Sequence, residues 1–476
     1  KDPDDGALRT HLIAVYQAVN RSGDAEKLIN TVLARNPRDL NALLQRSVLR
    51  LESGNVTDAQ TDLNQVLHDS AAVADAHFVQ ARIYETNGST LSERQELNET
   101  LRLNPLFLPA RIALARLLTN SGKGAKTAIE LLNETPEEQK ASLAVLAERN
   151  WAFAALGDFE EMRKGVQQGL AVQRTPDLLV QDATLRLAGK DFIAARQAAE
   201  EALRTAPDDI RALDVLARSY SEQKQSQTAM EKLREYAAKE LQSSTVQLYL
   251  GRWLQAQGDV TGARAALTAA KAADSNSADT DLALAQLDLM EGKWGTARKG
   301  ITAILGRNSR NITARYWLAQ VERIEGNDKA SIEEYRKVIA ADPTNTNALN
   351  NLAVLLGEQG DQGGEAMTLA QRAKELAPDN PAIADTWGWL LYRNGLYKLA
   401  VRQLEEANSR HSTALRASHL SMAYFKSGSP ERARQMLQQA VTMDPNLPDV
   451  KQAKQLLAAS ATGPDGGQDQ PRRIPK

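Results

Sequence analysis

This chain of 476 residues lacks several features, and each absence excludes a class of site or function. It has no cysteine, which excludes disulfides, a thiol nucleophile and a thiolate metal site. Neither sign of charge dominates, since 58 basic residues stand against 60 acidic ones. This balance argues against a dedicated nucleic-acid or anionic-membrane surface. No apolar run approaches the roughly 18 residues of a membrane span, so we expect no such span in this fragment.

Motifs that carry chemistry are also scarce. The five histidines form no H-E-x-x-H zinc pair, and we interpret His68 and His77 as surface or packing residues rather than a metal site. The glycine-rich segment 122–127 has the wrong spacing for a phosphate-binding loop. We therefore predict no enzymatic activity, no cofactor and no metal.

The sequence has instead a repeated pattern of two helices around a turn, clearest between Thr344 and Pro381. Apolar residues spaced three and four apart share one helical face over 349–356 and again over 366–376. Gly360 separates the two helices. Pro378 ends the second one, because proline lacks the N–H that a helix interior needs.

Glycines follow the turns of this pattern along the chain. They are Gly23, Gly54, Gly88, Gly122, Gly157, Gly189, Gly258, Gly292, Gly326, Gly360, Gly395 and Gly428. Successive gaps run from 31 to 35 residues, apart from one double gap of 69 before Gly258. The double gap predicts a further turn near Lys224, which gives about 13 repeats.

This repeat resembles the tetratricopeptide (TPR) repeat, a helix-turn-helix unit of about 34 residues, over nearly the whole chain. The resemblance implies an all-α, right-handed superhelical α-solenoid of about 13 TPR repeats with a C-terminal capping helix. We predict the array over 1–445, the capping helix over 446–459 and a disordered tail over 460–476. The first helix of the fifth repeat, Glu137 to Leu156, is predicted to be longer than the others. Helical pattern already near Asp5 leads us to expect further repeats or another domain before Lys1.

The C-terminal third resembles a narrower group, the bacterial TPR lipoproteins associated with exosortase/PEP-CTERM systems and exopolysaccharide export. The resemblance rests on Leu352-Ala353, on the stretch Ala377–Pro381 and on Asp385–Trp389. It implies a periplasmic or envelope location rather than a cytoplasmic one, and polysaccharide-export machinery among the partners.

In such an array the first helices line a concave groove. We expect the groove to bind a protein or peptide. Residues two, three, six and ten positions before each turn glycine should face it. In the last repeats this rule selects Tyr316, Arg323, Asn350, Asp385, Trp389, Tyr392, Arg393, Phe425 and Lys426. Aromatic side chains beside arginine are typical of recognition surfaces. The alternative is that Trp389 and Phe425 only pack against the neighbouring repeat.

The sequence thus favours a non-enzymatic protein-interaction scaffold of the bacterial envelope. Three alternatives stay open: a cytoplasmic scaffold or co-chaperone, the substrate-recruiting arm of an enzyme whose catalytic domain lies elsewhere, and a saccharide-binding module. Because contacts should run only between neighbouring repeats, we also expect unfolding that departs from a single two-state transition.

Overall fold

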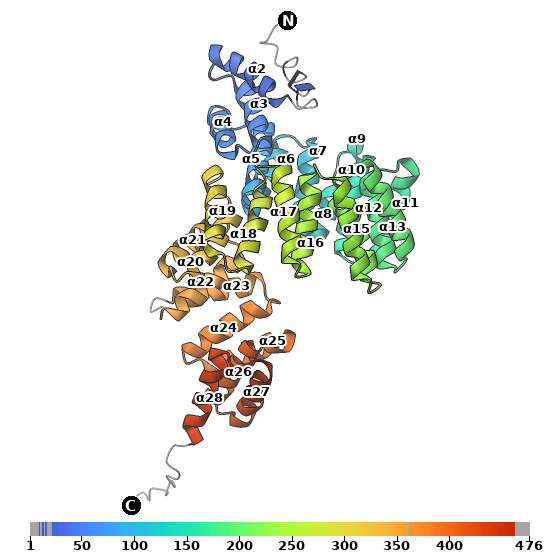
Figure 1. Ribbon diagram of the computed structural model, residues 1–476. Coiled ribbons are helices and arrows are strands. Elements are labelled where there is room, and N and C mark those ends of the chain that lie inside the picture. The colour runs from blue at the N-terminus through green and yellow to red at the C-terminus, as the bar shows by residue number, and fades with distance from the viewer. Residues whose placement is uncertain (1–8, 10–11, 14, 17–20, 361–363, 462–476) are drawn as a thin grey trace, which may run out of the picture. The chain divides into compact units, whose positions relative to one another are not determined.

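The computed structural model describes residues 21–360 and 364–461, together with Arg9, Leu12, Ile13, Val15 and Tyr16. Throughout these residues the regular secondary structure is helical, and none of them lies in a strand. The helices, α2 to α28, follow one another along the chain (Figure 1). The chain divides into two compact units, unit 1 (Lys1–Val321) and unit 2 (Glu322–Lys476). The prediction of an all-α solenoid of helix pairs is confirmed.

Unit 1 contains helix pairs in which a first helix is followed by a turn and a second helix. Its helices are α2 (Ser22–Arg35), α3 (Leu40–Glu52), α4 (Val56–Asp69), α5 (Ala74–Asn87), α6 (Thr90–Leu103), α7 (Leu108–Asn120), α8 (Ala125–Asn133), α9 (Glu137–Lys140), α10 (Leu143–Ala155), α11 (Phe159–Val172), α12 (Pro176–Ala188), α13 (Phe192–Thr205), α14 (Ile210–Ser221), α15 (Ser226–Lys239), α16 (Ser244–Ala256), α17 (Val260–Ala273), α18 (Ala278–Met290) and α19 (Trp294–Arg307).

Helix α20 (Ile312–Ile324) spans the boundary between the units. Unit 2 continues the same pattern with α21 (Asp328–Ala341), α22 (Thr346–Glu358), α23 (Glu365–Leu376), α24 (Pro381–Arg393), α25 (Tyr397–Arg410), α26 (Ala414–Lys426), α27 (Pro430–Met443) and α28 (Pro448–Ala461).

The predicted turn glycines have the left-handed conformation at every position except Gly23 and Gly189. Glycine suits these turns because it has no Cβ to clash when φ is positive. At Gly23 the prediction was wrong, since this glycine lies within the first turn of α2. At Gly189 the helix α12 has already ended at Ala188, and the left-handed position falls one residue later, at Lys190, with φ of 62°.

The turn predicted in the double gap is confirmed. Lys224 has φ of 62° and connects α14 to α15. A non-glycine residue here keeps the geometry of the turn, and the backbone N–H of Gln225 donates to the carbonyl of Tyr220 at 3.0 Å, as in the glycine turns. Lysine tolerates the position at a steric cost of roughly 1–2 kcal/mol.

The long first helix predicted for the fifth repeat is wrong. The segment divides into the short α9 and the helix α10, which begins after Ser142. Ser142 has extended backbone angles, φ −63° and ψ 129°, and its carbonyl accepts from the N–H of Leu146 at 3.1 Å. Ser142 occupies the N-cap position of α10, where serine is one of the preferred residues. The extra turn therefore belongs to the connection after α8 rather than to α10.

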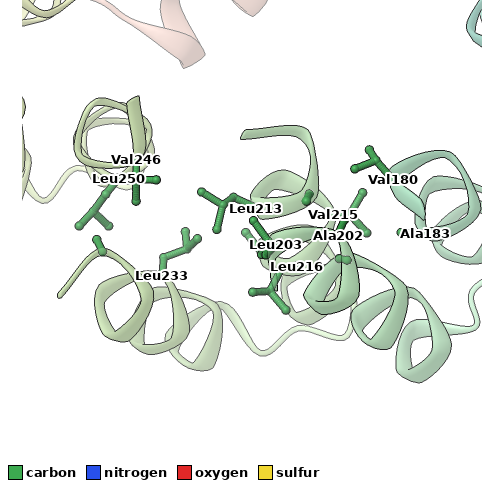
Figure 2. Packing of buried hydrophobic residues seen from close by; sticks show 14 of the residues in the cluster. Val180, Ala183, Ala202, Leu203, Leu213, Val215, Leu216, Leu233, Val246 and Leu250 are labelled. Carbon is green, nitrogen blue, oxygen red and sulfur yellow. The ribbon is translucent and has the colours of Figure 1, made fainter. Parts of the chain in front are cut away.

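Small residues allow the two helices of a pair to lie close together. A Cβ on Gly251 of α16 would stand 2.6 Å from Cδ2 of Leu267 on α17, so only glycine fits there. In unit 2, Ala400 of α25 is fully buried. Figure 2 shows part of the largest apolar cluster, in which Leu213 and Leu216 of α14 lie among side chains of the adjacent helices.

Unit 1 also contains a contact between segments far apart in sequence. Nδ2 of Asn308 donates to Oδ1 of Asn87 at 2.7 Å, and both side chains are buried. Nearby, Thr57 donates to the carbonyl of Arg307 at 3.3 Å. Asn87 and Asn308 are 221 residues apart, about six and a half repeats of 34 residues. The array of unit 1 therefore contacts itself, which a chain of purely neighbouring contacts would not do.

The last helix, α28, follows the final pair and packs against α26 and α27. Val450 and Ala453 on its inner face are fully buried. The exact division into array, capping helix and tail stays a prediction. The predicted disorder falls almost wholly on residues 462–476, and the predicted helix start near Asp5 falls on residues 1–8. Both lie outside the described residues.

Candidate functional site

Three of the predicted groove residues, Asp385, Trp389 and Tyr392, share one face of α24. The Trp389 ring stacks on Tyr392 with centroids 4.9 Å apart, and on His419 of α26 with centroids 4.0 Å apart. Both pairs are nearly parallel, at 12°. Tyr392 also meets Tyr397 of α25 at 5.6 Å. The structure brings these three predicted residues together, and the Trp389 ring stacks on two other rings.

His419, which the spacing rule did not select, is the centre of a buried charged group. Its Nδ1 lies 3.1 Å from Oδ1 of Asp385, and its Nε2 lies 3.4 Å from Oδ1 of Asp449. Its exposed fraction is 5%. We call Asp385, His419 and Asp449 the His419 cluster. It joins three helices of unit 2, namely α24, α26 and α28.

The two carboxylates determine the protonation state of His419. Burial lowers the pKa of the imidazole, but Asp385 and Asp449 outweigh burial and raise this pKa to about 9. In turn, the hydrogen bond from His419 lowers the pKa of Asp449. His419 is therefore protonated near neutral pH, and an imidazolium donates through both ring nitrogens. Each nitrogen then faces one carboxylate, which ties α28 to the preceding repeats.

The two predicted arginines of unit 2 link successive first helices. Arg323 forms ion pairs with Asp328 at 3.1 Å and with Glu358 of α22. Arg393 of α24 is exposed and donates to the carbonyl of Gly357 at 2.7 Å. Both side chains thus hold neighbouring repeats together in the structure. Binding of a partner by either one stays a prediction.

The other predicted residues are more scattered. In unit 1, Tyr316 meets Trp317 edge-on at 5.8 Å. In unit 2, Asn350 is half-buried, Phe425 packs at the border of an apolar cluster, and Lys426 is exposed. The position of Phe425 fits the packing alternative. Phe425 packs against the same apolar cluster as Tyr392 of α24, and the role of these residues as a groove stays a prediction.

A hollow of about 670 Å³ lies on unit 1, outside the predicted set. We call it the unit 1 hollow. All of its lining residues belong to first helices, namely α7, α10, α12, α14 and α16; of these, α7, α10, α12 and α16 are labelled in Figure 1. The lining consists of Arg116, Thr119, Asn120, Glu148, Trp151, Ala154, Ala155, Thr184, Ile210, Arg211, Asp214, Val215, Arg218 and Tyr249.

The spacing of residues before each turn is a sequence signal for this hollow. The rule stated for the last repeats also selects residues of unit 1. Six residues before the turn residues Gly122, Gly157 and Lys224 it selects Arg116, Trp151 and Arg218, and all three line the hollow. The same rule therefore identifies the same helix face in unit 1.

Charged and hydrogen-bonded side chains hold the walls of the hollow in place. Arg116 of α7 forms an ion pair with Glu148 of α10. Tyr249 donates its hydroxyl to Asp214 at 3.2 Å, and Arg218 lies 3.7 Å from the same carboxylate. Burial and the nearby Asp214 raise the pKa of Tyr249, so its hydroxyl stays protonated and available as a donor. The Arg116–Glu148 and Tyr249–Asp214 contacts cross from one repeat to the next, whereas Arg218 and Asp214 both belong to α14.

The hollow also has an apolar wall. Trp151 is half-buried against two core clusters, so its ring is held by packing. Ile210 is 44% exposed although it is a large aliphatic residue. Val215 of the same helix also lines the hollow and is buried. A rigid aromatic ring beside exposed apolar surface and arginine is the composition that concentrates binding energy in protein interfaces.

The structure also bears on metal sites and membrane-spanning helices. Among the described residues, no group of three or more His, Asp or Glu side chains is placed to hold a metal ion. His77 lies 2.6 Å from Glu96, and His68 lies 2.9 Å from Asp69. None of the described helices has the length and apolar character needed to span a membrane.

Three family models, each described as Tetratricopeptide repeat, match parts of the chain. They cover residues 44–106 and 282–346, residues 334–364, and residues 413–443. The match over 413–443 coincides with the pair α26 and α27, whereas the matches over 44–106 and 334–364 begin within α3 and α21. These matched segments carry tetratricopeptide repeats. The matches lie near both ends of the array as well as in its middle, in agreement with one repeat type along the chain.

Comparison with individual proteins adds relatives of the same kind. A TPR repeat-containing protein of Pseudomonas aeruginosa is 35% identical over 139 residues. The match covers 29% of this TPR chain and 23% of that relative, so the chain spans about a quarter of the relative's length.

Among solved structures, yeast Tom70 is similar with 15% identity and a TM-score of 0.47, over 94% of this chain and 99% of that one. The APC/C hetero-tetramer Cut9–Hcn1 is similar with 15% identity and a TM-score of 0.45, over 96% and 90%.

Proposed function

We propose that this TPR chain is a non-enzymatic scaffold that binds a segment of a partner protein in the unit 1 hollow. TPR arrays use the faces of stacked repeats as extended binding surfaces. The observation that carries the proposal is the lining of the hollow. It comes from first helices alone and places the half-buried Trp151 beside Arg116 and Arg218. Tryptophan and arginine are the residues that most often dominate binding energy in interfaces.

We further propose that the scaffold works in the bacterial envelope, in exopolysaccharide assembly or export or in protein sorting. The support is the resemblance of the C-terminal third, in particular 377–381 and 385–389. The similarity to a TPR protein of Pseudomonas aeruginosa agrees with a bacterial setting.

Site-specific photocrosslinking tests both proposals. A photoreactive residue at Asn120, which is exposed and lines the hollow, is compared with one at Lys164, which is exposed on α11. We expect one or more envelope proteins to crosslink from position 120 and not from position 164. Equal crosslinking from both positions would count against the hollow, and crosslinking to cytoplasmic proteins alone would count against the envelope role.

A second arm asks whether unit 2 contributes. The double variant Tyr392→Ala/Arg393→Ala removes two predicted groove residues of α24. If this variant loses a partner that position 120 does not crosslink, the working surface belongs to unit 2 rather than to the hollow. Retention of the partner keeps the assignment to unit 1. Circular dichroism of the variant checks that the helices are intact.

The saccharide alternative receives less support from the structure. The Trp389 ring, which would stack on a sugar, already stacks on Tyr392 and His419. A polysaccharide that changes the tryptophan fluorescence of the parent chain, but not that of a Trp389→Phe variant, would support this alternative.

A further inference from the structure

We infer that the contact between Asn87 and Asn308 is a reversible clasp. Unit 1 opens and closes at this contact while its repeats stay folded, and the unit 1 hollow accepts its partner in the closed form. The statement about the partner rests on the proposed function, whereas the opening does not. Three observations carry the inference: the uncharged groups that form the contact, the hollows on both sides of it, and the helix ends that meet there.

The clasp consists of uncharged polar groups. Nδ2 of Asn308 donates to Oδ1 of Asn87 at 2.7 Å, and Thr57 donates its hydroxyl to the carbonyl of Arg307 at 3.3 Å. When the contact opens, water replaces each lost partner, and a neutral hydrogen bond therefore shifts such an equilibrium by only about tenfold or less. The clasp holds unit 1 closed without preventing it from opening.

Hollows flank the clasp, so little packed surface joins its two sides. One hollow of about 600 Å³ lies between the turns at Gly54 and Gly88 and the ends of α18, α19 and α20. Another, of about 190 Å³, lies between α4, α5 and residues 308–310. The buried apolar residues of α2 to α5 and those of α18 to α20 belong to separate clusters. The clasp thus crosses from one core to another, whereas a single cluster runs through the neighbouring repeats from α12 to α18.

Two helix C-termini meet at the clasp. Asn87 is the last residue of α5, and Asn308 is the C-cap of α19; both helices are labelled in Figure 1. The C-terminal end of a helix dipole is negative, so two such ends repel each other mildly. This repulsion opposes the hydrogen bonds and favours opening.

The clasp bears on the unit 1 hollow because of its place along the chain. The helices that line the hollow, α7, α10, α12, α14 and α16, all come between α5 and α19. Contacts such as Arg116 with Glu148 and Tyr249 with Asp214 join successive first helices of this series. When the ends of the series separate, its curvature changes, and the spacing of the first helices changes with it. Opening should therefore weaken binding in the hollow, whose walls have their observed spacing in the closed form.

Distances between two spin labels test the opening. The chain has no cysteine, so Asp58→Cys on α4 and Ala303→Cys on α19, both exposed, place one label on each side of the clasp. We expect one short distance to dominate in the parent chain. The variant Asn87→Asp/Asn308→Asp puts two like charges at helix C-termini, and should lower the ratio of short to long distances at least about tenfold. Aspartate at position 308 keeps the oxygen that accepts from the N–H of Arg310.

A matched control separates opening from local damage. Asn36 and Asn104 are the C-caps of α2 and α6, and each accepts from the N–H two residues further on, as Asn308 does. The variant Asn36→Asp/Asn104→Asp should therefore leave the label distances unchanged. A second label pair, Ala265→Cys with Ala303→Cys on α17 and α19, lies on one side of the clasp and should give the same distance in every variant. Circular dichroism checks that each variant keeps its helices.

An engineered disulfide tests the coupling to the hollow. A Cβ on Gly88 would lie 3.9 Å from Cβ of Ile312, which is within the range of disulfides. Gly88 has positive φ, and Lys224 shows that a turn of this chain accepts a side chain in that conformation. Gly88→Cys/Ile312→Cys is combined with the double variant at positions 87 and 308. We expect this chain to lose most of the partner crosslinking from position 120 when reduced, and to regain it when oxidised.

Three results would overturn the inference. The first is a short distance that Asn87→Asp/Asn308→Asp leaves unchanged, and the second is a loss of helices in this variant instead of opening. The third is equal crosslinking from position 120 in the reduced and oxidised forms, which would remove the coupling to the hollow. Failure of the proposed function is distinguishable, because the spin labels need no partner. If position 120 crosslinks nothing in the parent chain, the scaffold function fails, and the label distances still decide whether the clasp opens.

Discussion

Deprotonation of His419 is expected to loosen the attachment of α28 to unit 2. The imidazolium lies between Asp385 and Asp449, which come from α24 and α28. Within the described residues, α25 and α27 bring no further carboxylate or base into contact with the imidazole ring. When His419 loses its proton, it keeps only one N–H and can donate to only one of the two carboxylates. The other carboxylate then stays partly buried without its cation.

The sign and size of the effect follow from the pKa values. The folded pKa of His419 is about 9, above the model-compound value of 6.5, so its stabilisation is fully present below about pH 6.5. It is lost as the pH rises through about 9. At about 1.4 kcal/mol for each pKa unit, the difference amounts to about 3 kcal/mol. Asp449 acts in the opposite direction: its pKa is lowered, so its contribution is lost as the pH falls below its ordinary value of 3.8. Attachment should be strongest between about pH 4 and 6.5.

Hydrogen exchange read by mass spectrometry measures this directly. The free energy of opening for peptides from α26 and α28, corrected for the intrinsic pH dependence of exchange, should fall by about 3 kcal/mol between pH 6 and pH 9.5. The variant His419→Phe keeps a ring beside Trp389 but cannot titrate, and should show no such fall. His411 is exposed, and a His411→Phe control should behave like the parent chain.

Two results would refute this reasoning. One is a pH dependence that is the same in the parent chain and in His419→Phe. The other is an NMR titration that places the pKa of His419 below 6.5, because burial would then outweigh the two carboxylates.

Three further predictions concern stability, each read from the midpoint of urea or thermal unfolding. Ala400→Leu should cost about 1–3 kcal/mol, because the residue is fully buried between the helices of its pair; unchanged melting would mean that the repeat register is wrong. Lys224→Gly should stabilise unit 1 by up to about 1 kcal/mol, and Gly258→Ala should destabilise it, because both positions have positive φ. Asn87→Ala should cost about 1–3 kcal/mol by leaving the buried amide of Asn308 without its partner; a neutral result would mean that water replaces the contact.

The repeat architecture was predictable because its signals are local. A left-handed turn residue, a helix of fixed length and a small residue at the pair contact recur at a constant spacing, so even the turn at Lys224 could be located without its glycine. The failures are local as well. The left-handed position after α12 falls at Lys190, one residue after Gly189, and a lysine in the left-handed region leaves no mark in the sequence. Before α10, Ser142 divides a segment whose apolar pattern reads as one helix.

The candidate sites were only partly predictable, because the spacing rule selects a helix face and not what that face meets. It selected Asp385 and Trp389 without their neighbour His419, which lies on another helix. The pairing of His419 with Asp449 depends on how α28 packs, and no periodicity in the sequence encodes that contact. The unit 1 hollow shows the opposite case, where the rule would have selected Arg116, had it been applied there.

The contact between Asn87 and Asn308 bears on how the whole array unfolds. A solenoid with contacts only between neighbours behaves as a one-dimensional chain, in which each repeat can open with limited effect on distant ones. In unit 1, however, a buried hydrogen bond joins residues 221 positions apart. Opening of any repeat between them disturbs that bond, so the intervening repeats share its stabilisation. Unit 1 should therefore unfold more cooperatively than the sequence pattern implies, whereas α28 of unit 2 depends on a separate, titratable contact at His419. Because the unit 1 hollow lies among the intervening helices, the same distant contact also helps to keep its walls in place.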